Sequence, residues 1–227
     1  MFLSVGIANW ACAHELMQCI ASVAPRYTVH PSMESSSSSS QEGNSVEPDE
    51  VLMQRYQRGS ERAFRILYER HRSPLLRFVK RLAPDGGEDE EIAQETWMAV
   101  IKGRERFLPE ARFVTYLYSI ARRRTVDRWR RRGRLPEFHD EGLDSLLGPT
   151  QHEPDHQLNN TALGVDLLEA IATLPLPQRE AFLLRAEGGL SIEEIAAVTG
   201  ANRETAKSRL RFAMSRLRKA MEPWHDD

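Results

Sequence analysis

Apolar residues recur at steps of three and four along most of the chain between residues 49 and 220, and no stretch of useful length alternates apolar with polar residues. The first pattern lines one face of a helix, whereas the second would indicate a half-buried strand. The sequence therefore predicts an all-α fold. A chain of 227 residues has room for one or two domains.

The first group of predicted helices occupies residues 49–132. A first helical segment starts near Asp49, is interrupted at Gly59-Ser60, and allows a kink or a new start at Pro74. A loop is expected at 84–87. A helix from Glu88 to Lys102 follows, and then one long helix or two abutting helices from Arg112 to Arg132. Acidic residues crowd the start of the helix at Glu88, where they complement the positive end of the helix dipole.

A second group of helices is predicted at residues 165–222, after a segment without periodicity at 133–164. About thirty structureless residues are unusual inside one compact domain, so we place a boundary there and expect a flexible linker. Leu174 closes one helix before Pro175 and Pro177, and Gly188-Gly189 ends the next.

Residues 191–219 have the pattern of a helix-turn-helix. Ser191 and Glu194 fit a capping box, S-x-x-E. Gly200 provides the positive φ that a sharp turn between helices needs, and Ala196 is small enough for the second helix to approach. The second helix carries a buried stripe, namely Ala206, Leu210, Ala213, Met214 and Leu217. A helix-turn-helix places its second helix in the major groove of DNA.

Charge is strongly segregated, although the net charge is only −2. Residues 122–134 hold eight arginines and one acid, residues 203–219 hold seven basic residues and one acid, and residues 133–165 hold six acids and one arginine. Local charge governs contact with phosphates. The two basic segments therefore indicate two separate contacts with nucleic acid, joined by an acidic tether.

Residues 1–48 lie outside the helical pattern and are expected to be a disordered extension. The first 25 residues make a poor signal peptide, because they lack a basic start and contain His14 and Glu15. We expect a mis-assigned start, with Met33 as the first residue. Cys12 and Cys19 form no C-x-x-C pair, which favours a reducing cytoplasm, and no run of eighteen apolar residues suggests a membrane span.

No pattern of catalytic or metal-binding residues emerges. Most histidines fall in predicted loops or tails without the spacing of metal ligands. The Gly-Gly pairs are helix breaks and not phosphate-binding loops. We therefore expect no enzyme activity, no metal and no cofactor.

Four segments in a fixed order, followed by the helix-turn-helix, carry a family resemblance. They are the acidic helix 88–97 (EDEEIAQETW), the stretch 111–122 (ARFVTYLYSIAR), the ending Asp127–Arg131 (DRWRR) and the entry 174–185 (LPLPQREAFLLR). Together they resemble the sigma-70 family of bacterial RNA polymerase sigma factors, in its extracytoplasmic-function (ECF) group. Tyr116 occupies a position where the family often has Trp, and Arg123 one where it often has Asn. The resemblance therefore does not indicate which promoter bases this chain prefers.

The resemblance implies a region-2-like domain at 49–132 that binds core RNA polymerase and the downstream (−10) promoter element, and a region-4-like domain at 165–222 that binds the upstream (−35) element. The implied polymerase contacts, to the clamp helices of the largest subunit, are Glu88, Glu90, Glu91, Gln94 and Glu95. A contact with the polymerase flap and an anti-sigma factor are further implied partners.

The resemblance also assigns promoter contacts to both basic segments, on single-stranded as well as double-stranded DNA. The implied −10 contacts are Arg112, Tyr116, Arg122, Arg123, Arg124, Arg128, Trp129 and Arg131. The implied −35 contacts are Arg203, Glu204, Lys207, Ser208 and Arg211. Arginine suits phosphates and guanine edges, glutamate can accept a hydrogen bond from cytosine, and aromatic faces suit unstacked bases.

Several alternative interpretations of these residues and of the whole chain remain. Phe113 is expected to face the core, and Asp127 can simply pair with Arg123 or Arg131 one helical turn away. The acidic linker can enter polymerase channels or serve only as a solubilising tether. The chain as a whole can alternatively be an autonomous helix-turn-helix regulator that binds duplex operator without polymerase, or an adaptor whose first domain binds only proteins.

Overall fold

The computed structural model of the chain describes residues 47–83, 87–108, 110–133 and 162–222. Every regular element within these ranges is helical, which confirms the predicted all-α class. The extension before residue 47 and most of the predicted linker lie outside the described residues.

The first four α-helices form the N-terminal unit. They are α2 (Asp49–Gln57), α3 (Glu61–Leu82), α4 (Asp89–Lys102) and α5 (Phe113–Arg131), with the short 3-10 helix η1 (Arg104–Arg106) between the last two. The Ser60 side chain accepts a hydrogen bond from the Ala63 N–H and so begins α3 at the predicted break. Pro74 does not start a new helix, because α3 continues through it.

The C-terminal unit contains α6 (Ala162–Thr173), α7 (Leu176–Gly188), α8 (Ile192–Thr199) and α9 (Arg203–Ala220). Helix α7 ends where the sequence predicted, and Gly189 takes the left-handed conformation with φ 61°. The predicted capping box is present at the start of α8, with Ser191 and Glu194 bonded reciprocally. Gly200 has φ 71° between α8 and α9, so the helix-turn-helix forms as predicted.

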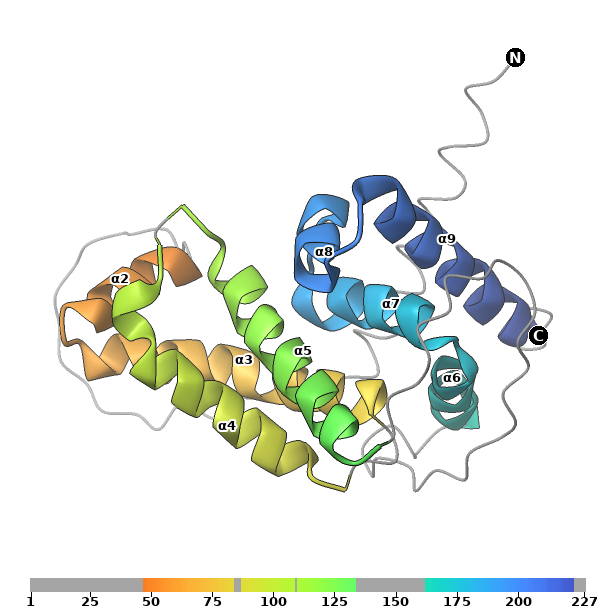
Figure 1. Cartoon of the computed structure of the whole chain (residues 1–227), viewed down its shortest axis with the longest axis horizontal. Helices are drawn as coiled ribbons and strands as arrows, with labels where there is room; N and C mark the ends of the chain where they lie inside the picture. Colours follow the sequence, from red (N-terminus) through yellow and green to blue (C-terminus); the bar gives the residue numbers. More distant parts are fainter. Residues whose placement is uncertain (1–46, 84–86, 109, 134–161, 223–227) are drawn as a thin grey trace, which may run out of the picture.

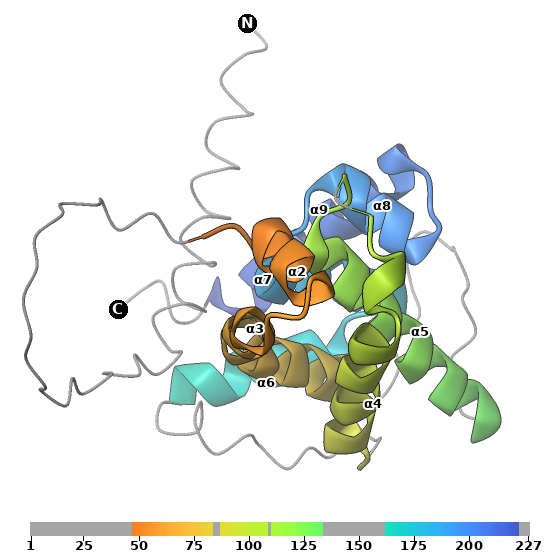
Figure 2. The same cartoon turned by 90° about the vertical axis from the view of Figure 1, so that its left-hand side faces the viewer.

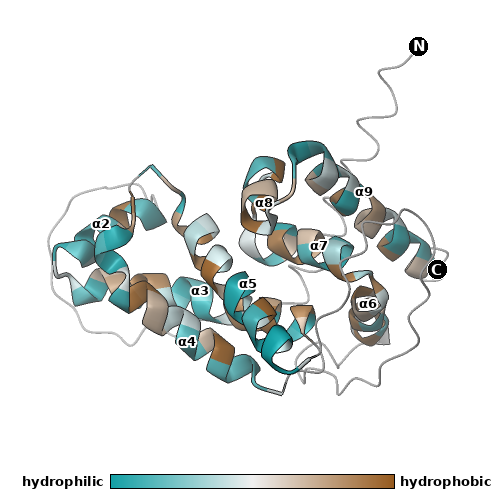
Figure 3. Cartoon of the chain, viewed as in Figure 1, coloured by the Kyte–Doolittle hydropathy of each residue, from teal (hydrophilic) through white to brown (hydrophobic). Residues whose placement is uncertain are grey.

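Apolar residues of both units belong to one continuous core. In the N-terminal unit its largest fully buried members include Phe78, Phe113 and Tyr118, and in the C-terminal unit Phe182 and Leu183. The predicted stripe of α9 is buried at Ala206, Ala213 and Leu217 and partly buried at its other two positions. Figure 3 shows hydrophobic and hydrophilic segments along the same helices, as expected of helices that bury one face.

The two units pack directly on each other. Helix α7 lies against α3 and α5, and α8 lies against the first turns of α5. Figures 1 and 2 show the C-terminal unit beside α5 and α3, on the opposite side from α4. This packing places the two basic helices, α5 and α9, in one body.

Candidate nucleic-acid and polymerase interfaces

The outward face of α9 is free of the core and rich in charge. Its first residue, Arg203, follows the cap residue Asn202, whose side chain accepts a hydrogen bond from the Thr205 N–H at 2.7 Å. Arg203, Glu204, Lys207 and Arg211 are exposed. Because the opposite face of the helix is held by the apolar stripe, these side chains point away from the molecule at the N-terminal end of the recognition helix.

The charged side chains of this face pair with groups that are themselves exposed, and such surface ion pairs contribute little to stability. Arg203 donates to Glu193 of α8 at 2.6 Å, and Lys207 lies 3.8 Å from Glu204. The hydrogen bond from Arg203 lowers the pKa of Glu193 and the same bond raises the pKa of Arg203. Ser208 differs from its neighbours, because it is partly buried and its hydroxyl donates to the Thr205 carbonyl at 3.0 Å.

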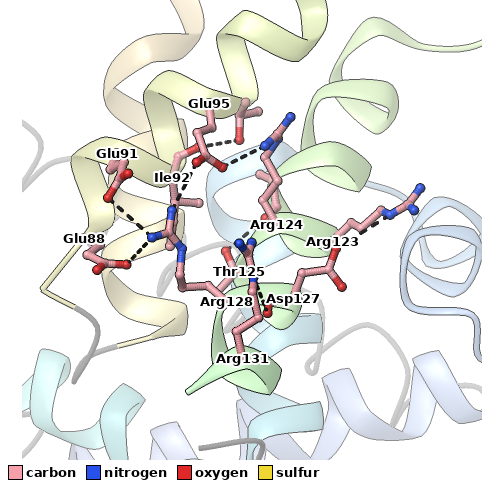
Figure 4. Close-up of polar contacts among 12 residues, drawn as sticks. Glu88, Glu91, Ile92, Glu95, Arg123, Arg124, Thr125, Asp127, Arg128 and Arg131 are labelled. Atoms are coloured by element: carbon pink, nitrogen blue, oxygen red, sulfur yellow. Dashed lines mark hydrogen bonds and ion pairs between the residues drawn. The ribbon is translucent and has the colours of Figure 1, made fainter. Parts of the chain in front are cut away.

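Helix α5 presents its arginines differently, because several of them face carboxylates of α4. Arg128 bonds Glu88 at 2.6 Å and Glu95 at 3.1 Å, and lies 3.4 Å from Glu91. Only 17% of the Arg128 side chain is exposed. Figure 4 shows this guanidinium directed into the group of three carboxylates.

Two further arginines extend this α4–α5 network. Arg124 donates to Glu95 at 2.7 Å, so that Glu95 is shared between Arg124 and Arg128. Arg132, just beyond the end of α5, pairs with Glu88. The network fixes α4 against α5 with charge-assisted hydrogen bonds, which are stronger than neutral ones.

The opposite side of α5 leaves other cations open to solvent. The Arg123 side chain is 85% exposed and lies 3.9 Å from Asp127, and in Figure 4 it points away from α4. Arg131 is also exposed, and its Nε donates to the Asp127 carbonyl at 3.3 Å. Asp127 is thus paired within its own helix, at Arg123 and at Arg130.

Two more arginines of the implied −10 set contact the C-terminal unit. Arg112, just before α5, donates to Glu194 at 3.0 Å. Arg122 donates to Glu180 of α7 at 2.5 Å. Burial raises the pKa of Glu180, and the neighbouring Arg122 offsets this only in part. The carboxylate of Glu194 also accepts from the Thr115 hydroxyl at 2.7 Å and from the Ser191 N–H at 2.8 Å.

The aromatic residues of α5 separate into core and surface positions. Phe113 and Tyr118 are fully buried, as expected of Phe113. Tyr116 and Trp129 are partly exposed. The Tyr116 ring lies 5.6 Å from the Phe107 ring, and burial raises the pKa of its hydroxyl. Tyr116 and Trp129 are therefore the aromatic faces of α5 within reach of an outside ligand.

The acidic residues of α4 also fall into two sets. Glu88 and Glu95 turn toward α5, where the arginines bind them. Glu90 and Gln94 are exposed, next to Met98, a methionine that is itself exposed. Glu91 lies between the sets, exposed but within reach of Arg128. The outward surface of α4 is accordingly acidic with one apolar residue.

The α4–α5 network was missed by the sequence reasoning, although a signal was present. Glu88, Glu91 and Glu95 are spaced three and four residues apart, as are Arg124, Arg128 and Arg132 at steps of four. Such spacing lines one helix face, so two helices carrying complementary rows can pair along their length. The carboxylates that receive Arg112 and Arg122 have no comparable signal, because they lie in the other unit.

Within the part of the chain that the structure describes, no group of three His, Cys, Asp or Glu side chains could hold a metal ion. None of the described helices is both long and apolar enough to span a membrane. His71 of α3 is largely buried and bonds Asp49 at 2.7 Å.

Comparison with known proteins places both units in one group. The profile of Sigma-70 region 2 matches residues 67–135, and that of Sigma-70 region 4 matches residues 164–217. The RNA polymerase sigma-H factor of Pseudomonas aeruginosa is 32% identical over 187 residues, which cover 78% of this chain and 95% of that protein. The ECF RNA polymerase sigma-E factor of Escherichia coli is 29% identical and covers 77% of this chain and 95% of its own length.

This chain is also similar to a solved structure of a sigma factor. The sigma factor RpoE of Bartonella quintana, determined in complex with the anti-sigma factor NepR, is 26% identical and aligns with a TM-score of 0.54. The alignment covers 70% of this chain and 96% of that one.

Proposed function

Because this chain belongs to the sigma-70 family, in the ECF group of RNA polymerase sigma factors, we propose that its two units engage two different promoter elements. As a sigma factor, it binds core RNA polymerase and directs promoter recognition, promoter melting and transcription initiation. The same comparisons favour this function over an autonomous regulator that binds operator DNA without polymerase.

The C-terminal unit, about residues 165–222, binds the upstream (−35) element through α9. Arg203, Lys207 and Arg211 supply exposed cations at the helix end that enters a major groove. Glu204, exposed between them, can accept a hydrogen bond from cytosine. Ser208 contributes less, because its hydroxyl is already bonded to the backbone.

The N-terminal unit, about residues 49–132, binds the downstream (−10) element through α5. Exposed Arg123 and Arg131 contact phosphates, and Tyr116 and Trp129 offer rings on which unstacked bases regain about 1–3 kcal/mol each. Arg112 and Arg122 join them once their carboxylate partners move away. Arg124 and Arg128 act mainly by fixing α5 against α4.

The outward face of α4 binds the polymerase. Glu90, Gln94 and Glu91 form an acidic surface beside Met98, suited to a basic partner such as the clamp helices of the largest subunit. Glu88 and Glu95 support this face through the α4–α5 network. The flap of the polymerase is the expected contact of the C-terminal unit, and an anti-sigma factor is a further expected partner, as in the solved complex of the relative.

The observation that carries this division of roles is the presence of two exposed cationic helices, one in each unit matched by a sigma-70 region. We propose a role without catalysis and without a cofactor, because sigma factors act as transcription initiation factors.

Reconstituted transcription tests the proposal. Purified chain and sigma-free core polymerase should co-elute and give run-off transcripts from promoters found by selection in vitro. Variants Arg203→Ala and Arg123→Ala should lose activity on different halves of those promoters. If the chain instead failed to associate with the core enzyme and bound a duplex operator tightly by itself, the proposal would be wrong.

A further inference from the structure

Helix α2 lies against three other elements, namely α3, η1 and the start of α5 (Figures 1 and 2). Asp49, its first residue, bonds Arg70 and His71 of α3 and so anchors α2 to the longest helix of the N-terminal unit. Other polar side chains of α2 contact the start of α5 and residues 103–108, which follow α4 and contain η1. We call residues 103–108 the η1 segment.

The Gln57 side chain holds the η1 segment at two points. Its amide nitrogen donates to the carbonyl oxygen of Arg104 at 2.7 Å and to that of Phe107 at 3.0 Å. An amide group has two N–H donors, so one side chain can satisfy both carbonyls. The neighbouring Tyr56 adds a cation–π contact, because the Arg104 guanidinium lies 5.6 Å from its ring centroid. The end of α2 therefore fixes both ends of η1.

Glu50 of α2 holds the start of α5. Its carboxylate accepts a hydrogen bond from the Phe113 N–H at 3.0 Å. Arg112, the residue before the helix, has no side-chain acceptor with which to cap it. The negative charge of Glu50 also suits the positive end of the α5 dipole. Helix α2 thus supplies the cap that the residues next to α5 lack.

The Tyr116 ring of α5 rests on the η1 segment. Its centroid lies 5.6 Å from that of the Phe107 ring, and Phe107 is only 3% exposed. A Cβ atom added to Gly103 would lie 2.8 Å from the Tyr116 hydroxyl oxygen, so this oxygen lies directly against the glycine backbone. The position of Tyr116 therefore depends on Gly103 and Phe107, which flank η1, and through them on Gln57.

From these contacts we propose that α2 sets the geometry of the −10 surface, with Gln57 and Glu50 as positioning residues for Tyr116. This inference rests on the proposed function of Tyr116 as a ring on which an unstacked base lies. A ring that is already in place binds the base more tightly, because ordering the ring during binding costs affinity. Gln57 and Glu50 are partly buried and act through the η1 segment and α5, without touching DNA.

The environment of Tyr116 tests the positioning without polymerase or DNA. The full chain is labelled with 3-fluorotyrosine at its five tyrosines, and Tyr116→Phe identifies the Tyr116 signal in the fluorine NMR spectrum. Gln57→Met keeps the length of the side chain and removes both donors, so it should shift or broaden that signal. Gln54→Met, the same substitution one turn earlier on α2, is the matched control and should leave it unchanged. An unaltered Tyr116 signal in Gln57→Met would overturn the proposal.

Binding of the reconstituted holoenzyme to two promoter probes measures the consequence. One probe carries the duplex −35 element alone, and the other continues as a single strand through the −10 element. The affinity ratio of the two probes is the single-strand gain, and loss of folded protein does not change it. If the η1 segment of Gln57→Met is correctly placed about one-tenth of the time, the single-strand gain falls about tenfold. An unchanged gain would contradict the proposal.

Further variants of α2 separate positioning from a general loss of stability. Gln57→Lys keeps a donor of similar reach and should recover most of the single-strand gain. Glu50→Ala removes the cap of α5 and should lower the gain, whereas Glu50→Gln keeps an acceptor and should retain most of it. Thermal unfolding is followed for every variant. If the gain followed the melting temperature regardless of the donor or acceptor present, the role of α2 would be structural only, and the proposal would be wrong.

Combination with Tyr116→Ala distinguishes this inference from the function on which it rests. Without the ring, Gln57→Met should lower the single-strand gain no further, because residues that act through one another have non-additive effects. Additive losses would show that Gln57 acts by another route and would contradict the proposal. If Tyr116→Ala kept the full gain, the proposed function of Tyr116 would be refuted. If Tyr116→Ala lost the gain and Gln57→Met kept it, that function would stand and positioning by α2 would be wrong.

Discussion

Helices α5 and α9 have similar compositions but offer their charges to the surroundings in different ways. On α9 the cations at the recognition end are exposed, and their few carboxylate neighbours are exposed as well. On and next to α5, five arginines contact carboxylates elsewhere in the protein. Arg124, Arg128 and Arg132 contact carboxylates at α4, and Arg112 and Arg122 contact carboxylates of the C-terminal unit. Only the side of α5 that carries Arg123 and Arg131 presents exposed cations, as the recognition end of α9 does.

This difference shows that a count of basic residues does not measure a nucleic-acid surface. An arginine surrounded by carboxylates contributes to folding, and it binds phosphate only if those carboxylates leave. Helix α9 is therefore ready for duplex DNA as it stands, whereas α5 is only partly available. The two helices should accordingly respond in opposite ways to alanine substitution, one losing binding and the other losing stability.

The largest effect is expected on α9. Replacing Arg203 and Arg211 together by alanine removes two exposed guanidinium groups, each worth about 1–3 kcal/mol of discrimination if bidentate to a base. Run-off transcription with core polymerase should fall accordingly on a promoter with its upstream element, and much less on one where that element is scrambled. Thermal unfolding should be unchanged.

Arg216→Ala is the control for that pair, since Arg216 is an exposed arginine of α9 outside the recognition end. A loss for Arg216→Ala equal to that of the double variant would show that α9 acts through charge alone.

The next effect concerns stability and belongs to α5. Arg128→Ala leaves Glu88, Glu91 and Glu95 facing one another without their shared cation. Charge-assisted hydrogen bonds contribute about 1.5–3 kcal/mol each, so we expect a loss of about that size in the free energy of unfolding. Urea denaturation of the free chain measures it.

Arg130→Ala, on the exposed side of the same helix, serves as the comparison and should change stability little. Arg128→Lys should recover only part of the loss, because a lysine cannot span three carboxylates in the planar geometry of arginine. Equal stability of the Arg128 and Arg130 variants would contradict the α4–α5 network.

A smaller effect is expected at the start of α8, the helix that packs against α9. Ser191→Ala removes the hydroxyl that accepts from the Glu194 N–H at 3.2 Å. Losing such a cap costs about 1 kcal/mol, which a melting curve resolves. Ser191→Asp should retain the cap, and Ser215→Ala, at an exposed position within α9, should have no effect. If Ser191→Asp were as destabilised as Ser191→Ala, the capping interpretation would fail.

The smallest change in stability is expected for Arg123→Ala, within about 0.5 kcal/mol of the wild type. Its effect should appear in DNA binding by the holoenzyme. Loss of one phosphate contact lowers the slope of log affinity against log salt by about one, uniformly across sequences. A change in base preference at the −10 element, with an unaltered slope, would place Arg123 on a base and not on a phosphate.

Local features of this fold could be predicted from the sequence, because they depend on neighbours within one or two helical turns. The capping box at Ser191, the turn at Gly200 and the buried side of α9 follow from spacing and backbone preference. The alternative that Pro74 starts a new helix was wrong, because α3 continues through it without interruption. The core position of Phe113 followed from the stripe it shares with Leu117.

The partners of the charged residues could not be predicted in the same way. Arg122 and Glu180 are 58 residues apart, and Arg77 and Glu187 are 110 apart. No spacing rule in the sequence pairs residues so far apart, and only the packing of α7 against α3 and α5 reveals which cation meets which acid. The assignment of Arg124 and Arg128 to DNA, by contrast, overlooked a signal that the sequence contains, the row of carboxylates at Glu88, Glu91 and Glu95.

The burial of the ion pairs between the units has a consequence for how the protein responds to salt. The side chains of Glu180 and Glu187 are each only 3% exposed, so salt screens their pairs with Arg122, Arg77 and Arg81 much less than it screens exposed charges. Phosphate contacts with the promoter depend strongly on salt. Rising ionic strength should therefore weaken DNA binding well before it loosens the packing of α7 on α3 and α5.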